Sequence, residues 1–174
     1  MPIEIRKKAP TKGIFDAVRS LTRNEVLVGV PAENAGRQPE PGEERTLNYA
    51  EIGYLNEFGG TGKLFGHEVT IPPRPHLRPG VADAKDEIAK HLKAGAMGAL
   101  RGDKDAAERA LGRAGLAGQM GVQNKISNGP FAPLAPYTLK KRKAKGRTGE
   151  APLIDTGIYR SARITYVVRP KGED

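Results

Sequence analysis

The glycine-rich stretch at 59–64 has the residue types of a phosphate-binding loop. Glycines precede Lys63, as in a loop whose backbone N–H groups and lysine hold a nucleotide phosphate. Such a loop also needs a glycine five residues before its Gly-Lys pair and a serine or threonine after it. Glu57 and Leu64 occupy those positions, and the stretch follows a predicted helix rather than a strand. We therefore predict no nucleotide site here.

The triplet Asp155-Thr156-Gly157 matches the sequence around the catalytic aspartate of aspartic proteases, in which two carboxylates share one proton. In those enzymes the aspartate follows a strand, whereas here a helix and a strand are predicted after it. Only one such triplet is present, so a protease would need a homodimer to supply the second carboxylate. The basic, glycine-rich surroundings argue against this activity. The structural alternative is that Asp155 or Thr156 caps a short helix and Gly157 permits a tight approach.

The histidines His67, His76 and His91 are scattered, with no i, i+4 pair and no acidic residue at ligand spacing, which is not the pattern of a metal site. The chain has no cysteine, and therefore no thiolate nucleophile and no disulfide. The Gly-x-Ser-x-Gly motif of many hydrolases is also absent. These observations predict that the protein is not an enzyme and uses no metal or cofactor.

Six cations with no acid among them form a basic run. The run consists of Lys140, Lys141, Arg142, Lys143, Lys145 and Arg147. With a net charge of +9 for the whole chain, this run is either a solvated basic loop or a strip that contacts DNA or an acidic partner. No aromatic residue alternates with the cations, so we expect no stacking of nucleic acid bases on them.

Composition predicts one domain over 1–174 with extended loops. The chain has 22 glycines and 14 prolines among 174 residues and only 5% aromatic residues, which predicts many turns and segments that become ordered against a partner. We expect flexible loops near 32–44, 59–68 and 128–151. No stretch reaches the roughly 18 apolar residues of a membrane span, and the charged residues 1–10 do not resemble a signal peptide.

Hydrophobic periodicity predicts an α+β fold, with a small antiparallel or mixed sheet packed against about three longer helices and a proline-rich arm. Strands are predicted at 3–5, 26–30, 69–71 and 164–168. Helices are predicted at 12–23, 46–58, 78–98 and 103–126, with shorter ones at 138–145 and 155–161. Thr46 is the expected cap of the helix that Gly59 and Gly60 stop.

Five segments, in this order, resemble the neck and tail-completion (virion morphogenesis) family of long-tailed bacteriophages. They are Val-Gly-Val at 28–30, the helix end Glu-Phe-Gly at 57–59, the arm Ile-Pro-Pro-Arg-Pro-His-Leu at 71–77, the proline-basic segment from 133 and Pro-Leu-Ile-Asp-Thr-Gly-Ile-Tyr-Arg-Ser at 152–161. The resemblance spans about residues 26–168 of this sequence. Two departures are His76 in place of the family's usual Phe and Ile158 in place of its usual Leu.

The resemblance implies a structural role at the head–tail junction of the virion, without catalysis. It implies a homo-oligomer, with a ring as the expected form, assembled in the host cytoplasm with other connector or tail proteins. The basic run would then face either the channel with the packaged DNA, in a non-specific contact, or the adjoining ring. The alternative is a basic DNA-binding accessory protein. No membrane partner is expected. The interface and arm residues that the resemblance implies are Glu57, Phe58, Ile71, Pro72, Arg74, Pro75, His76, Leu77, Asp155, Thr156 and Gly157.

Glu57 lies near the end of its predicted helix, where a carboxylate is unfavourable with the helix dipole. We therefore expect either a cationic partner, for which the resemblance suggests Arg74, or a solvated side chain. The four glycines within the helix at 103–126 each cost about 0.5–1 kcal/mol relative to alanine, a cost that close backbone packing can offset. In a ring, the proline arm and this glycine-rich helix are the expected surfaces between subunits.

Overall fold

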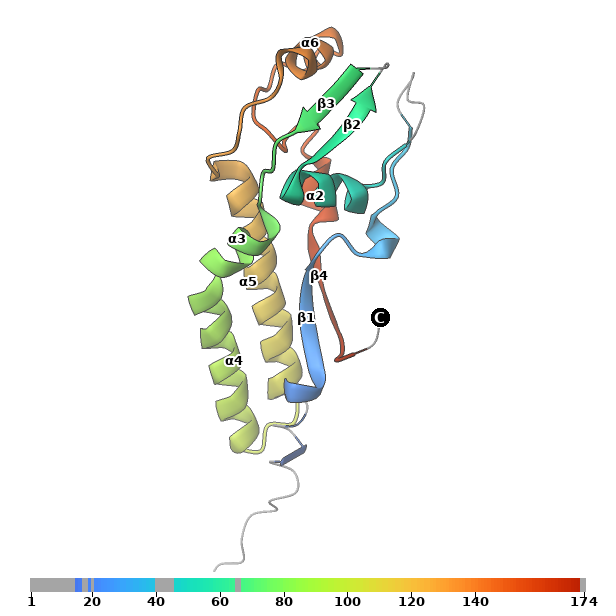
Figure 1. Ribbon diagram of the computed structural model, residues 1–174. Helices are drawn as coiled ribbons and strands as arrows, with labels where there is room; N and C mark the ends of the chain where they lie inside the picture. The colour runs from blue at the N-terminus through green and yellow to red at the C-terminus, as the bar shows by residue number, and fades with distance from the viewer. Residues whose placement is uncertain (1–14, 17–18, 20, 40–45, 65–66, 173–174) are drawn as a thin grey trace, which may run out of the picture.

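The computed structural model describes residues 15–16, 19, 21–39, 46–64 and 67–172 and has the α+β architecture predicted from the sequence (Figure 1). Two long helices lie side by side and form an elongated body, with a two-stranded sheet along one side of it. A second two-stranded sheet and several short helical elements gather at one end of this body. The described segments contain no helix long and apolar enough to cross a membrane.

The body is a helical hairpin. The predicted helix at 78–98 is two helices, α3 (Leu77–Asp83) and α4 (Lys85–Leu100), separated at Ala84, whose ψ of 4° leaves the helical range. The predicted helix at 103–126 is α5 (Ala106–Asn128), and both α3 and α4 pack along it. The single-helix prediction was wrong because residues on both sides of Ala84 carry the apolar spacing of a helix.

The glycines of α5 are used for packing within the chain. A Cβ atom on Gly121 would collide with the carbonyl oxygen of Gly80 on α3, and one on Gly115 would enter the ring of Tyr166. Such close approach of backbones offsets the conformational cost of glycine in a helix. The glycine-rich face therefore packs inside the subunit, which corrects its interpretation as a surface between subunits.

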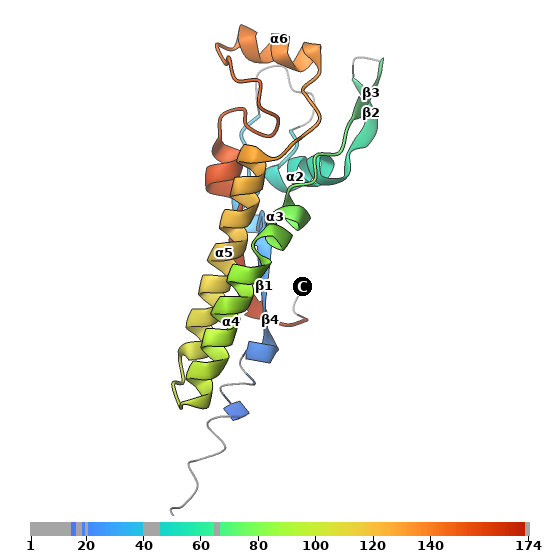
Figure 2. The same cartoon turned by 90° about the vertical axis from the view of Figure 1, so that its left-hand side faces the viewer.

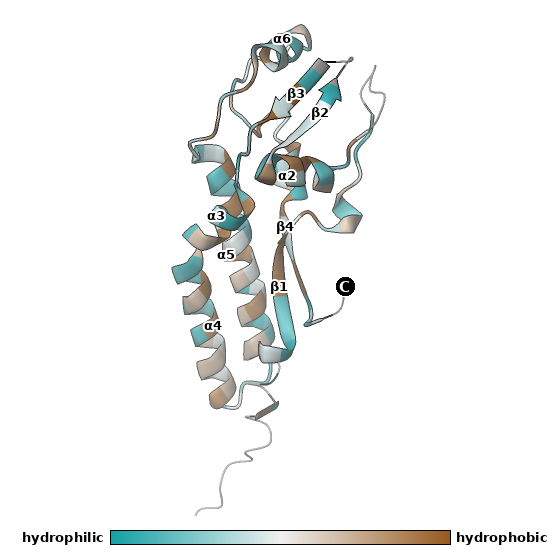
Figure 3. Ribbon diagram, viewed as in Figure 1, coloured by the Kyte–Doolittle hydropathy of each residue, from teal (hydrophilic) through white to brown (hydrophobic). Residues whose placement is uncertain are grey.

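The first sheet pairs β1 (Asn24–Gly29) with β4 (Thr165–Pro170) in antiparallel register, with Val28 opposite Tyr166. This confirms the strands predicted at 26–30 and 164–168. One face of the sheet lies on α5, and Figure 3 shows that the upper part of β1 is hydrophobic whereas its lower part is hydrophilic. Beneath it lies a small core that consists of Val122, Ile126, Tyr159 and Ile164.

The other end of the molecule begins with α2 (Tyr49–Phe58), which follows the short helical turn η1 (Ala32–Asn34). The side chain of Asn48, not Thr46, caps α2, because Asn48 and Glu51 exchange hydrogen bonds in a capping box. The aromatic rings of Tyr54 and Phe58 are exposed, so one face of this helix lies at the surface.

The predicted loop at 59–68 is largely a hairpin of β2 (Gly60–Leu64) and β3 (His67–Ile71). Figure 2 shows that this hairpin projects away from the body. After α5, the chain continues through 129–135 to α6 (Pro136–Ala144), and a π-helical turn η2 (Tyr159–Arg163) precedes β4. These bounds confirm the helical turns predicted at 138–145.

Several predictions fall partly or wholly on residues that the structure does not describe. The strand predicted at 3–5 lies outside the described residues, as do 40–44 of the predicted loop. Of the helix predicted at 12–23, the described residues 15–16, 19 and 21–23 are helical.

Candidate functional site

Glu57, near the end of α2, caps the N-terminus of α3. Its Oε2 atom accepts hydrogen bonds from the backbone N–H groups of His76 at 2.7 Å and Leu77 at 2.8 Å, and its Oε1 accepts one from Arg78 at 3.2 Å. The first N–H groups of a helix have no partner within that helix and carry partial positive charge, so a carboxylate satisfies them well. The expected pairing of Glu57 with Arg74 was wrong, because these backbone donors occupy the carboxylate.

The chain reaches this arrangement through a sharp change of direction at Gly59. Gly59 has a φ of +73°, and a Cβ atom there would lie 2.7 Å from the carbonyl oxygen of Ile71. Glycine adopts this backbone conformation without steric cost. The β2–β3 hairpin then returns the chain, and the N–H of Arg74 donates to the carbonyl of Asn56 at 2.6 Å.

Two opposing effects act on the pKa of Glu57. Burial raises it, but the backbone N–H groups of His76, Leu77 and Arg78 outweigh this effect, so the pKa lies below the usual value of a glutamate. At neutral pH the buried side chain is therefore a carboxylate that holds two parts of the chain together.

His76 is fully buried next to Glu57 and connects it to the C-terminal part of the chain. Its Nδ1 lies 2.8 Å from the carbonyl oxygen of Arg74, and its Nε2 lies 2.7 Å from the hydroxyl of Tyr159. Since a carbonyl only accepts, Nδ1 carries the proton and Nε2 accepts from the tyrosine. Burial lowers the pKa of His76, which keeps the ring neutral.

Tyr159 fits against α2 because position 53 is a glycine. A Cβ atom on Gly53 would lie 2.7 Å from the tyrosine oxygen. Burial, with a further contribution from the charge of Glu57, raises the pKa of Tyr159, so the hydroxyl remains protonated and donates to His76. The ring of Tyr159 also meets His76 edge-on, with centroids 5.6 Å apart.

Arg74 extends the same buried network to the proline segment that follows α5. Its Nε donates to the carbonyl of Ala132 at 2.7 Å and its Nη2 to that of Pro133 at 2.8 Å. Burial, together with the nearby charge of Arg142, lowers the pKa of Arg74. We refer to Glu57, Arg74, His76 and Tyr159 as the polar joint.

The sequence predicted that Asp155 or Thr156 caps a helix. Asp155 does not do so, and is instead the acidic residue of an ion-pair cluster. Its carboxylate contacts Arg142 at 3.3 Å and also pairs with Arg147. Arg142 in addition donates to the carbonyls of Gly149 and Ala151, both at 3.0 Å. A guanidinium with several acceptors serves as a fixed brace for the segment between α6 and η2.

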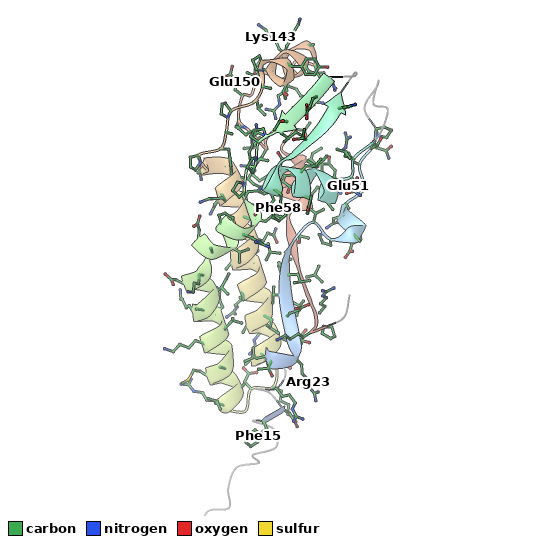
Figure 4. The ribbon with its side chains drawn as sticks, viewed as in Figure 1. Phe15, Arg23, Glu51, Phe58, Lys143 and Glu150 are labelled. Atoms are coloured by element: carbon green, nitrogen blue, oxygen red, sulfur yellow. The ribbon has the colours of Figure 1, made fainter. Side chains whose placement is uncertain are left out.

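This cluster divides the basic run into two parts. Arg142 is buried and Arg147 is half-buried, and both take part in packing within the chain. The lysines of the run are exposed on or just after α6, at the far end of the molecule, where Figure 4 labels Lys143. They are Lys140, Lys141, Lys143 and Lys145. Only this lysine part of the predicted basic contact is a surface feature.

The remaining predicted interface residues differ in their exposure to solvent. Phe58, Pro75, Thr156 and Asp155 are exposed to solvent. The half-buried members are Ile71, Pro72, Leu77 and Gly157. Of the predicted interface residues, these exposed ones are therefore at the surface, whereas the residues of the polar joint are buried.

The hydrogen bonds of the polar joint hold separate segments of the chain together. His76 and Glu57 have the residue types of a general base and its orienting acid, but both are buried together with Tyr159. A cleft of about 810 Å³ lies beside Tyr159, and Arg142, Asp155 and Thr156 contribute to its lining. Among the described residues, no three histidine or acidic side chains are grouped so that they could hold a metal ion.

Sequence reasoning named Glu57, Arg74 and His76 but missed their partners. No local sequence pattern predicts the contacts that Tyr159, Gly53 and the two carbonyls at 132–133 make with residues far away in the chain. The pairing of Asp155 with Arg142 and Arg147 was also missed, although their opposite charges were a usable signal.

No family model, no curated protein and no solved structure matches this chain. The geometry of the polar joint and its surroundings therefore carries the functional argument.

Proposed function

We propose that this chain is a structural protein of the head–tail junction in a long-tailed bacteriophage, acting in the neck or in tail completion by oligomeric assembly. The observation that carries the proposal is the meeting of four of the five family-like segments at one buried place. The helix end at 57–59, the arm at 71–77, the proline segment and the segment at 152–161 all join through the polar joint. These segments resemble the family and also depend on one another physically.

The arrangement supports a role in assembly rather than turnover. Buried charge-assisted hydrogen bonds to Glu57 hold the base of the projecting β2–β3 hairpin at one end of the helical body, and those from Arg74 hold the segment that leads to α6. A hairpin of two strands is marginally stable alone in water, and its strand edges can pair with another chain. In the proposed role these elements contact neighbouring subunits and other connector or tail proteins of the virion.

Disruption of the gene in the phage genome that carries it tests this proposal. Negative-stain microscopy of the lysate is expected to show DNA-filled heads beside unattached or malformed tails. The chain supplied from a plasmid should restore joined, infectious particles. Normal infectious particles without the gene would refute the proposal.

The lysines on α6 favour a second candidate, a basic DNA-binding accessory protein. Lys140, Lys141 and Lys143 are exposed on one short helix, and each lysine that neutralises a phosphate releases a counterion. The isolated chain would then bind DNA with an affinity that falls steeply with salt concentration. Replacing the three lysines by glutamine would reduce the slope of log K against log salt by about 0.9 for each phosphate that is no longer neutralised. Salt-insensitive or absent binding would exclude this candidate.

A further inference from the structure

The outer side of the α4–α5 hairpin, away from the β1–β4 sheet, carries an apolar groove. Ala84, Ala117 and Gly121 contribute to its lining, and Leu116 and Met120 stand one helical turn apart on α5. These two side chains are 48% and 53% exposed, although no function assigned above uses them. The groove has a volume of about 740 Å³, and the two helices that form it are side by side in Figure 2.

The two edges of the groove carry opposite charges. On the α4 side lie Asp83 and Glu87, and on the α5 side lie Arg113 and Lys125. Lys125 reaches Asp83 at 3.0 Å across one end of the groove. Glu87 pairs with the exposed Lys90 and contacts the half-buried His91, both on its own helix, while Arg113 is exposed and forms no ion pair with the residues that the structure describes.

We propose that this groove is the interface of a symmetric dimer of the chain. A two-fold axis along the hairpin places α4 of one copy against α5 of the other, so that the acidic edge of each copy faces the basic edge of its partner. Leu116 and Met120 of each copy then pack against the small residues of the facing groove, as ridges pack into grooves between helices. A second copy is the occupant because the chain itself supplies both the complementary charges and the matching apolar side chains.

This dimer is independent of the proposed role at the head–tail junction. It is a property of the purified full chain in solution, whereas the role in the virion is tested by gene disruption. If the chain forms no dimer but gene disruption gives defective particles, only the present inference is rejected. If the chain forms a dimer but disruption leaves normal particles, only the role in the virion is rejected.

Analytical ultracentrifugation of the full chain over a range of concentrations tests the inference. We expect a monomer–dimer equilibrium for the wild type. Met120→Glu should raise the dimer Kd at least about a hundredfold, because the charge enters the interface twice. Met97→Glu is the matched control, since Met97 is a similarly exposed methionine (45%) on α4 outside the groove, and it should leave the Kd unchanged.

Charge reversal gives the sharper test of the geometry. Arg113→Glu alone should raise the Kd at least about tenfold, because like charges then face one another across the interface. The double variant Arg113→Glu with Glu87→Arg should restore the Kd to near the wild-type value, since the two edges have exchanged signs. Far-UV circular dichroism checks that each variant is folded. A wild type that stays monomeric, a dimer insensitive to Met120→Glu, or a double variant no tighter than Arg113→Glu would overturn the inference.

Discussion

Replacing Glu57 by alanine tests the polar joint at its centre. The change leaves the N–H groups of His76 and Leu77 without their short bonds of 2.7 and 2.8 Å, and it also removes the bond from Arg78 at 3.2 Å. Each buried donor left unsatisfied costs about 1–3 kcal/mol, so the variant should be less stable by about 4 kcal/mol of unfolding free energy. Since small proteins are stable by about 5–15 kcal/mol, this is a large fraction of the total.

Glu57→Gln separates the carboxylate's charge from its shape. An amide oxygen can keep the bonds from His76 and Leu77 but brings no charge, so we expect a loss of about 1–2 kcal/mol at pH 7. The pKa of Glu57 is lower in the folded chain than in the unfolded chain. The charge therefore contributes stability above the unfolded pKa, and this contribution is lost as the pH falls through the folded pKa. The difference between the wild type and Glu57→Gln should shrink over that acidic range.

Urea unfolding followed by circular dichroism, at several pH values, measures these differences. Glu108→Ala provides the control, because Glu108 is an exposed acid on α5 and should change stability by no more than about 0.5 kcal/mol. A loss below about 1 kcal/mol for Glu57→Ala, well under that expected from two unsatisfied donors, would refute the capping role. A gap between wild type and Glu57→Gln that does not depend on pH would refute the ionised state of Glu57.

Four further predictions concern the polar joint and the segment that Arg142 braces. His76→Phe introduces the residue that is usual in the phage family that the sequence resembles. It should destabilise the chain by about 1–3 kcal/mol, because the hydroxyl of Tyr159 loses its acceptor. Adding Tyr159→Phe should recover most of the loss in a double-mutant cycle. Because the pKa of His76 is lowered in the fold, the wild type should lose stability as the pH falls below the unfolded histidine value, and the double variant should not lose it over that range. Gly53→Ala should cost about 1–3 kcal/mol through collision with Tyr159, measured by thermal unfolding, and a neutral result would mean that the ring can move aside. Arg142→Gln should speed limited proteolysis between α6 and η2, whereas Lys143→Gln should not, and equal cleavage of both variants would contradict the bracing role of Arg142.

Local patterns in the sequence predicted the elements whose formation depends on local residues. A compact β-branched run predicted β1, alternating residues predicted β4, and helical spacing predicted α5. The break at Ala84 and the cap at Asn48 were missed because each has a competing signal nearby. Apolar spacing continues across Ala84, and Thr46 is also a good capping residue. Such choices are decided by tertiary packing, which a single sequence does not display.

Only part of the candidate site was predicted, because its remaining contacts also depend on tertiary packing. The dipole argument correctly indicated that the carboxylate of Glu57 needs a positive partner, but it could not distinguish a guanidinium from the N-terminus of another helix. That choice depends on a hairpin returning the chain to the same point, and the glycine-rich residues at 59–64 were predicted as a loop. The contact of His76 with Tyr159 spans 83 positions in sequence, and no local pattern encodes it.

The way in which the β2–β3 hairpin is attached has a consequence for how such a chain can evolve. The bonds that close its base, from Glu57 to the start of α3 and from Arg74 to Asn56, come from residues outside the two strands. Substitutions at the exposed positions 61–63 and 68–70 of the two strands therefore leave these closing bonds in place. In the proposed role, these exposed strand positions can vary with the partner, while the residues that close the base of the hairpin remain under the constraints of the core.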